Sequence, residues 1–340
     1  MKITDFSYFL TSFLNKYLPG ECGYSNNTIS SYKYAFILLL KYFKNIEKIS
    51  VEKLSLKKIT KTNITAYLKW LETERNCSVQ TRNVRLAAIH SFFKYIQYES
   101  PENLFKCQEI LSIPMKRYES RSLSYMSLKG IKKLLELPNI NTRSGRRDLA
   151  LLSLLYDTAA RVQELIDLTP ISVGLEKPYT IQLKGKGNNV RIVPLMEPEI
   201  MILKNYMNEW NLNKIEYNNN PLFFNTRRKK LTRSGVSYIL NKYITKLREQ
   251  SPIIVPEKFS CHCLRHSKSM HMLQAGVNLI YIRDILGHKS VKTTEIYARA
   301  DSKQKREAIE KAYTNLIPKI EKSKWDENND LLEWLNNFDK

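Results

Sequence analysis

Apolar side chains recur at intervals of three and four residues along most of this chain, and this periodicity restricts it to a predominantly helical fold. In the stretch TISSYKYAFILLLKYF the pattern runs from Ile29 to Phe43, with Asn27 or Thr28 as the expected helix cap. It returns in TKTNITAYLKWLETE and in SVQTRNVRLAAIHSFFKYIQYE. Residues 1–111 are therefore predicted to form a small helical bundle.

A break in this pattern indicates a second domain. Residues 112–127 contain Pro114 and clustered serine and basic residues without a sustained period, so we expect an extended linker there. Helical periodicity resumes at Leu128, and residues 128–320 are expected to form the second domain. The length agrees with two domains, because 340 residues exceed a typical single core.

One segment of the second domain departs from helical periodicity. The stretch YTIQLKGKGNNVRIVPL has two short β-prone runs on either side of a centre rich in Gly and Asn, which is typical of a hairpin. The predicted fold class is therefore α+β: mainly α, with a small antiparallel β-sheet.

The charge of the chain indicates its class of partner. There are 55 Lys and Arg against 33 Asp and Glu, a formal net charge of +22, which attracts a polyanion strongly at low salt. Nucleic acid is the expected partner, and a merely basic composition without such a role is the alternative. The chain has no continuous apolar run of about 18 residues, and its five scattered cysteines fit a reducing compartment. These features predict a soluble cytoplasmic protein with no membrane partner.

A metal site is not expected, although cysteine and histidine gather near residue 262. Cys261, His262 and Cys263 lie close to His266 and His271, but no second Cys or His pair follows at a spacing typical of zinc sites. His266 and His271 are interpreted as structural. We expect neither a metal nor a cofactor.

Five polar stretches of the second domain carry residue types suited to phosphate chemistry. They are TAARVQEL with Arg161 and Glu164, KGKGNNVRIVP with Lys186, HCLRH with His262 and Arg265, LGHKS with His288, and TTEIYAR with Tyr297. Together and in this order they resemble the tyrosine recombinase family, also called λ-integrase-like, in which Arg, Lys, His-x-x-Arg, His or Trp, and a nucleophilic Tyr follow one another. The resemblance covers the second domain, and the first looks like the family's helical core-binding, DNA-binding domain.

The nucleophile is expected to be a tyrosine. A tyrosine hydroxyl can form a covalent bond to a DNA phosphate and later leave, which conserves the energy of the broken phosphodiester. Tyr297 has the family's spacing from His288, and Tyr281 and Tyr313 are the alternatives.

Arginine and histidine are expected to hold the phosphate. Guanidinium groups that fork onto two oxygens stabilise the charge of the transition state, a role for Arg161 and Arg265. A helix places His262 and Arg265 on one face, where both reach one anion. His262 and His288 would share hydrogen bonding to the phosphate and proton handling at the tyrosine, and Glu164 would orient Arg161 or His262.

The resemblance implies that Lys186 is the general acid that protonates the leaving 5′ oxygen. Lys184 is a nearby competitor, and only the resemblance selects between them. Ordinary alternatives also stand for the other positions: an exposed ion pair for Arg161 and Glu164, a turn lysine for Lys186, and a helix-end residue for His288.

Two positions depart from the family pattern. Cys261 stands where a proline often opens the His-x-x-Arg helix, with Ser260 as the expected cap. Lys268 stands where a small or apolar residue is usual, so we expect it to face DNA or solvent.

Basic residues on the polar faces of the first domain are candidate DNA contacts: Lys33, Arg82, Arg85 and Lys94. A solvated helix face is the alternative for each of them.

The resemblance implies a site-specific recombinase that cleaves and rejoins double-stranded DNA through a 3′-phosphotyrosine intermediate. Four protomers would assemble on two sites with inverted-repeat cores and exchange strands through a Holliday junction. The chain begins almost directly with the core-binding bundle, which favours a Xer-like or transposon-encoded enzyme. The alternatives are a type IB topoisomerase-like relaxing enzyme and a catalytically inactive DNA-binding regulator.

The last segment, residues 321–340, is acidic, unlike the rest of the chain. Leu331, Trp334, Leu335 and Phe338 follow the helical i, i+3, i+4, i+7 spacing. We expect a tail helix that docks either on its own catalytic domain or in trans on a neighbouring protomer.

Overall fold

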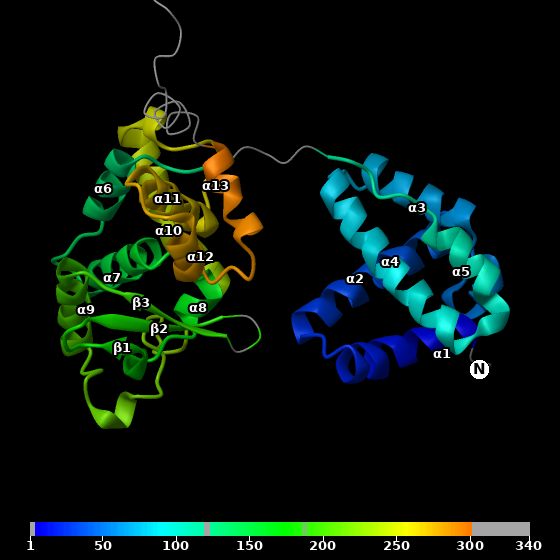
Figure 1. Cartoon of the computed structure of the whole chain (residues 1–340), viewed down its shortest axis with the longest axis horizontal. Helices are drawn as coiled ribbons and strands as arrows, with labels where there is room; N and C mark the ends of the chain where they lie inside the picture. Colours follow the sequence, from blue (N-terminus) through cyan, green and yellow to red (C-terminus); the bar gives the residue numbers. More distant parts are fainter. Residues whose placement is uncertain (1–3, 119–122, 186, 188, 301–340) are drawn as a thin grey trace, which may run out of the picture. The chain divides into compact units, whose positions relative to one another are not determined.

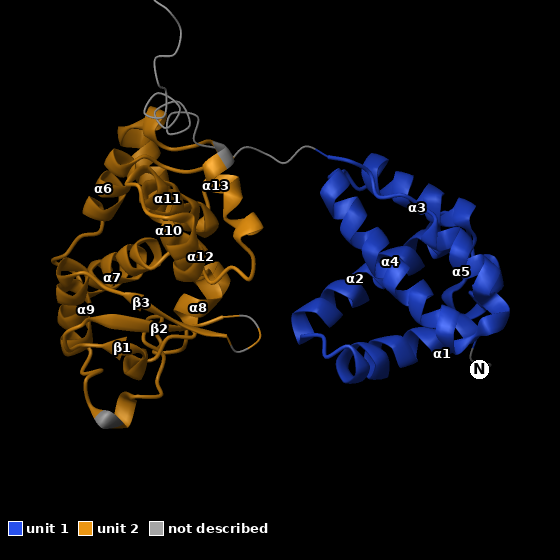
Figure 2. Cartoon of the chain, in the orientation of Figure 1, with its two compact units in different colours: residues 1–121 blue, residues 122–340 orange. Residues whose placement is uncertain are grey.

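The computed structural model describes residues 4–118, 123–185, 187 and 189–300. The chain divides into two compact units, residues 1–121 and 122–340, which Figure 2 shows in different colours. The tail at 321–340 and Lys186 lie outside the described residues.

The first unit is helical (Figure 1). Its elements are α1 (Asp5–Ser12), a π-helical segment (Phe13–Glu21), α2 (Asn26–Asn45), α3 (Lys61–Thr73), α4 (Val79–Glu99) and α5 (Leu104–Leu111), with 3-10 turns at Val51–Lys53, Leu56–Lys58 and Pro101–Asn103. Helix α2 begins two or three residues earlier than expected, since its N-cap is Ser25 rather than Asn27 or Thr28.

Aromatic residues fill the core of this unit. Phe13 meets Phe36 and Phe92 edge to face, at centroid distances of 6.2 and 5.3 Å. The apolar face expected along α4 is buried at Ile89, Phe92, Phe93 and Ile96. Burying rings and branched side chains on one face of each helix is what holds the bundle together.

The second unit combines helices with a small sheet (Figure 1). Its helices are α6 (Leu128–Glu136), α7 (Arg143–Asp157), α8 (Val162–Ile166), α9 (Glu197–Glu209), α10 (Arg233–Gln250), α11 (Cys261–Gln274), α12 (Leu279–Leu286) and α13 (Glu295–Ala300). The 3-10 turns are Pro170–Ser172, Ile215–Tyr217, Pro252–Ile254 and Val291–Thr293.

The sheet is antiparallel with the order β1 (Val173–Gly174), β2 (Thr180–Lys184), β3 (Val190–Pro194). The expected hairpin is β2 and β3, with Ile181 opposite Val193, and it confirms the predicted α+β class. The two-residue strand β1 was not predicted, because a pair so short leaves no alternating pattern. Strand β2 contacts α8 and strand β3 contacts α12, which brings the hairpin to the ends of both helices.

Helix α11 is the central element of the second unit and contacts α7, α10, α12 and α13. It buries side chains on most of its circumference, among them Leu264, Arg265 and Met270. A helix with neighbours on so many sides is held rigidly, so the polar side chains that it carries are fixed in place. In the described ranges, no helix combines the length and the apolar composition needed to cross a membrane.

Candidate active site

Arg265 is the buried centre of the site, with 1% of its surface exposed. Nη1 donates to the carbonyl oxygen of Ala159 at 2.7 Å, and Nη2 donates to that of Leu286 at 2.6 Å. These bonds fix the guanidinium between the segment after α7 and the end of α12. Burial lowers its pKa to about 10, with the charges of Arg161 and Arg191 adding to the effect, so the group stays cationic at neutral pH. A guanidinium has five N–H donors, and two carbonyl contacts leave others for an anion.

Glu164 joins two arginines beneath the site. It is 3% exposed and pairs with Arg161 Nη1 at 2.7 Å and Arg191 Nη2 at 2.7 Å. Oε2 also accepts the backbone N–H of Arg161 at 2.8 Å, which closes a capping box at the start of α8. Burial would raise the carboxyl pKa, but the hydrogen bonds from Arg191 and Arg161 outweigh it and hold the pKa at about 2. The carboxylate is therefore ionised and positions both guanidinium groups.

His288 follows the end of α12. Gly287 ends that helix with a left-handed backbone (φ 62°), and a Cβ there would lie 3.1 Å from Arg191 Cδ, so both conformation and space favour glycine. His288 Nδ1 lies 3.0 Å from the hydroxyl of Thr294. Burial, followed by the charges of Arg265 and Arg161, lowers the pKa of His288 to about 4. The ring is neutral at physiological pH.

Tyr297, on α13, is 1% exposed and reaches back to α11. Its hydroxyl lies 2.9 Å from Nδ1 of His266. Burial raises the pKa of Tyr297, an effect only partly offset by the Ser269 hydroxyl and the charges of Arg265 and Arg161. The phenol is protonated in this state. The alternative Tyr281 is 65% exposed, and Tyr313 lies outside the described residues.

His262 and His266 lie one turn apart on α11, with ring centroids 4.4 Å apart and planes at 73°. His262 keeps part of its surface exposed to solvent, but burial of the rest, followed by the charges of Arg265 and Arg161, lowers its pKa. The second structural candidate, His271, is bonded through Nδ1 to the hydroxyl of Tyr156 at 2.8 Å.

The start of α11 agrees with the expected cap position, since Ser260 is the N-cap, although its side chain makes no capping hydrogen bond.

Lys268 was expected to face DNA or solvent. It instead pairs with Asp157 at 2.6 Å and lies over the ring of Tyr156, because α11 packs on α7 at this point.

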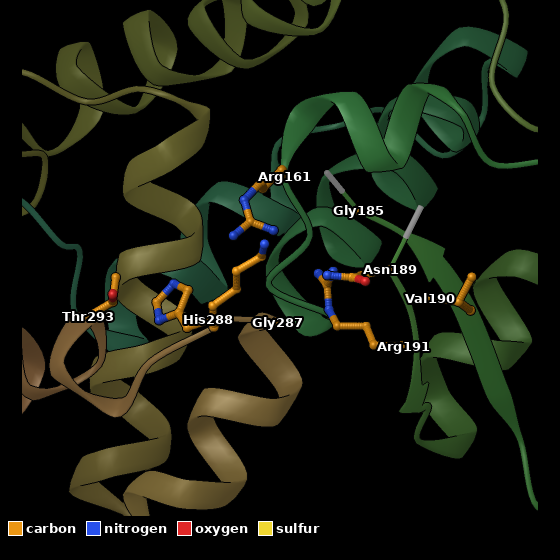
Figure 3. Close-up of a pocket in the computed structure, with 9 residues that line it drawn as sticks. Arg161, Gly185, Asn189, Val190, Arg191, Gly287, His288 and Thr293 are labelled. Carbon is orange, nitrogen blue, oxygen red and sulfur yellow. The ribbon is translucent and has the colours of Figure 1, made fainter. Parts of the chain in front are cut away.

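A pocket of about 390 Å³ lies at Arg161 and His288 (Figure 3). Among the described residues it is lined by Arg161, Gly185, Asn189, Val190, Arg191, Gly287, His288, Lys289 and Thr293, none of which is acidic. Three cationic side chains and a neutral histidine make it suited to an anion such as a phosphate. Lys186 lies outside the described residues; its neighbour Gly185 lines the pocket, and the competitor Lys184 is exposed at the end of β2.

The expected basic residues of the first unit differ in exposure. Lys33 and Lys94 are exposed, and Arg85 lies over the ring of Tyr34 at 4.8 Å. Arg82 was expected on the exposed face of its helix, but it is 5% exposed, and its Nη1 donates to the carbonyl oxygen of Pro114 at 3.2 Å. The segment after α5 crosses α4 here and covers Arg82.

Among the residues that the structure describes, no cluster of three or more His, Cys, Asp or Glu side chains could hold a metal ion.

Comparison with known proteins places this arrangement in a family. The model of the phage integrase family matches residues 124–304, more than half of the chain, and that of the phage integrase N-terminal SAM-like domain matches residues 10–99. The chain is 32% identical over 297 residues to tyrosine recombinase XerD of Oceanobacillus iheyensis, which covers 87% of this chain and 92% of that protein. It is 34% identical over 302 residues to y4rC of Sinorhizobium fredii, covering 89% and 90%. The chain belongs to the phage integrase family.

This recombinase also has the fold of solved family structures. The XerH site-specific recombinase in a post-cleavage complex with a palindromic difH substrate superposes with a TM-score of 0.67 at 24% identity, covering 82% of this chain and 78% of that one. The Tn1549 transposon integrase, in complex with a circular intermediate DNA, gives 0.68 at 15% identity, covering 91% and 100%. The expected resemblance is confirmed, and the chain is a site-specific tyrosine recombinase.

The recombinase brings Arg161, His262, Arg265, His288 and Tyr297 into one electrostatic cluster, since the charges of Arg161 and Arg265 shift the pKa values of His262, His288 and Tyr297. Sequence reasoning missed Arg191 and the contact between His266 and Tyr297. Arg191 lies in strand β3, and nothing in the sequence distinguishes it from the other basic residues of the hairpin. The only sequence signal for His266 was the pair of histidines in HCLRH.

Proposed function

We propose that this recombinase cleaves and rejoins double-stranded DNA at a specific site through a 3′-phosphotyrosine intermediate on Tyr297. The observation that carries the proposal is the buried phenol of Tyr297 within the field of Arg161 and Arg265, together with a pocket that Arg161, Arg191 and Lys289 line. A phosphodiester in that pocket would meet the groups that its transition state requires.

Arg161 and Arg265 stabilise the charge that develops on the nonbridging oxygens. Their positions are set before DNA arrives, Arg161 by the ion pair with Glu164 and Arg265 by two carbonyl groups. Preorganised donors lose no reorganisation energy during the reaction, so each contributes more than a mobile cation.

His262 and His288 hydrogen-bond to the same phosphate. A Thr294 hydroxyl that donates to Nδ1 of His288 leaves the ring proton on Nε2, which then faces an acceptor as a donor. Lys186, as the general acid, protonates the leaving 5′ oxygen.

On DNA, four protomers bind two sites with inverted-repeat cores and exchange strands through a Holliday junction. The palindromic substrate of the structurally similar XerH supports the inverted-repeat expectation. The first unit contributes Lys33, Lys94 and Arg85 to DNA binding, and the tail 321–340 docks in trans on a neighbouring protomer. A Xer-like or transposon-encoded role in the cytoplasm, at the nucleoid, fits these relatives.

Strand exchange between two duplexes tests the function. Sites would first be recovered by selecting bound duplexes from random-sequence DNA, and two differently labelled duplexes with the recovered site would then be incubated with the protein. The wild type should give duplexes carrying both labels, and Tyr297→Phe should bind but give none. Tyr281→Phe, which alters an exposed tyrosine, is the matched control and should recombine normally. Relaxation of supercoiled DNA without exchange would instead identify a topoisomerase, and binding without breakage an inactive regulator.

A further inference from the structure

Tyr297 must lose its phenolic proton when its oxygen bonds to phosphorus, and a side chain lies ready to take it. His266 Nδ1 is 2.9 Å from the Tyr297 hydroxyl, and the two rings lie 5.7 Å apart between centroids. We propose that His266 is the proton acceptor for the nucleophile. The inference rests on the proposed function, and it gives His266 a task that the sequence pattern assigns to His262 and His288.

The protonation states of the pair fit this direction of transfer. Burial, and then the charges of His262 and Arg265, lower the pKa of His266 to about 4, while burial raises that of Tyr297. Both groups are therefore neutral at physiological pH. Proton transfer requires the tautomer in which Nδ1 of His266 accepts the phenolic hydrogen and the ring's own hydrogen lies on Nε2.

Two other bases near the site, His288 and Glu164, are committed elsewhere. His288 uses Nδ1 for the hydroxyl of Thr294. Glu164 is bound to Arg161 and Arg191, and a carboxylate with a pKa of about 2 is a weak base. His266 is thus the base already hydrogen-bonded to the reacting oxygen, which is the first requirement for proton transfer.

In cleavage, the Tyr297 oxygen forms its bond to phosphorus as the bond from phosphorus to the 5′ oxygen breaks. The phenolic proton passes to Nδ1 of His266, and the departing 5′ oxygen takes a proton from Lys186. In rejoining, the 5′ hydroxyl attacks and returns its proton to Lys186, and His266 gives its proton back to Tyr297. The negative charge of the bound phosphate offsets the positive charge of Arg265, so DNA binding raises the base strength of His266.

His266→Asn separates proton transfer from positioning. The amide can keep a hydrogen bond near the place of Nδ1 but cannot take a proton. We expect single-turnover cleavage of a nicked suicide duplex, built on the selected site, to slow by about 100-fold or more with duplex binding unchanged. His271→Asn is the matched control, because His271 lies on the same helix and also bonds a tyrosine hydroxyl through Nδ1. It should cleave at the wild-type rate.

Chemical rescue provides the second measurement. His266→Ala leaves a ring-sized space, and added imidazole should restore cleavage there, whereas pyrazole, a ring of the same size and far weaker basicity, should not. Wild-type cleavage by His266→Asn, or imidazole that rescues no better than pyrazole, would overturn proton acceptance by His266. Failure of the wild-type protein to form any adduct would overturn the proposed function itself, and the inference with it.

Discussion

Replacing Glu164 with Gln removes the negative charge that lies between the guanidinium groups of Arg161 and Arg191, whose side chains are 38% and 11% exposed. The folded pKa of about 2, against an ordinary value of 4.5, corresponds to about 3 kcal/mol of stability at neutral pH. Loss of one partner from a buried ion pair costs about 3–5 kcal/mol, so both routes give the same magnitude. For a unit of this size, 1 kcal/mol lowers the melting temperature by about 2–4 °C. We expect Glu164→Gln to lower the melting temperature of the second unit by about 6–12 °C.

The stability that Glu164→Gln loses depends on pH, and the sign of this dependence is definite. Because the folded pKa of Glu164 is depressed, its stabilisation is fully present above pH 4.5 and is lost as the pH falls toward 2. The difference between wild type and Glu164→Gln should decline from about 3 kcal/mol at pH 7 to about 2 kcal/mol at pH 3.5.

Scanning calorimetry of the full chain at both pH values measures the effect. Glu197→Gln is the matched control, because Glu197 pairs with Lys177 at 3.6 Å in an exposed position and such pairs contribute about 0–1 kcal/mol. If Glu164→Gln melted at the wild-type temperature at pH 7, or if its difference in stability from the wild type did not change with pH, the assigned ion pairs would be refuted.

Four further outcomes are expected. Lys186→Ala should slow cleavage by about 10²-fold or more, and a 5′-phosphorothiolate leaving group should restore much of the rate; a rate that stays low would assign Lys186 to binding. Lys33→Ala and Lys94→Ala should each weaken DNA binding and reduce the slope of log affinity against log salt by about 1 in anisotropy titrations, whereas unchanged slopes would exclude phosphate contacts. Arg82→Ala should lower the melting temperature of the first unit and leave the salt slope unchanged, since Arg82 is buried; a reduced slope would show that it meets DNA. Deleting residues 325–340 should keep half-site binding and abolish cooperative binding to full sites in gel shifts, and retained cooperativity would refute docking in trans.

The helices and the hairpin could be predicted from sequence because their signals are local. Apolar spacing in α2 and α4 depends on residues within a few turns, and the Gly- and Asn-rich turn of β2 and β3 is contiguous. Arg82 shows the limit of this reasoning. Periodicity placed it on the polar face of α4, but that face is covered by the segment around Pro114, more than 30 residues away.

The chemistry of the site was predictable in type, and its contacts were not. Glu164 and Arg191 are 27 residues apart, and His266 and Tyr297 are 31 apart. No periodicity links such positions, because their contacts depend on how the hairpin of β2 and β3 meets α8 and how α11 meets α13. The burial that neutralises His266 and His288 has the same tertiary origin.

The residue that becomes joined to DNA is the most direct test of the account. Wild-type protein would be trapped on a suicide duplex and digested with trypsin, which cuts after Lys292 and Arg299 and so releases residues 293–299 as one peptide. Mass spectrometry should find the nucleotide on Tyr297 of that peptide. A nucleotide on Tyr281 or Tyr313 instead would contradict the assignment of the nucleophile and the site built around it.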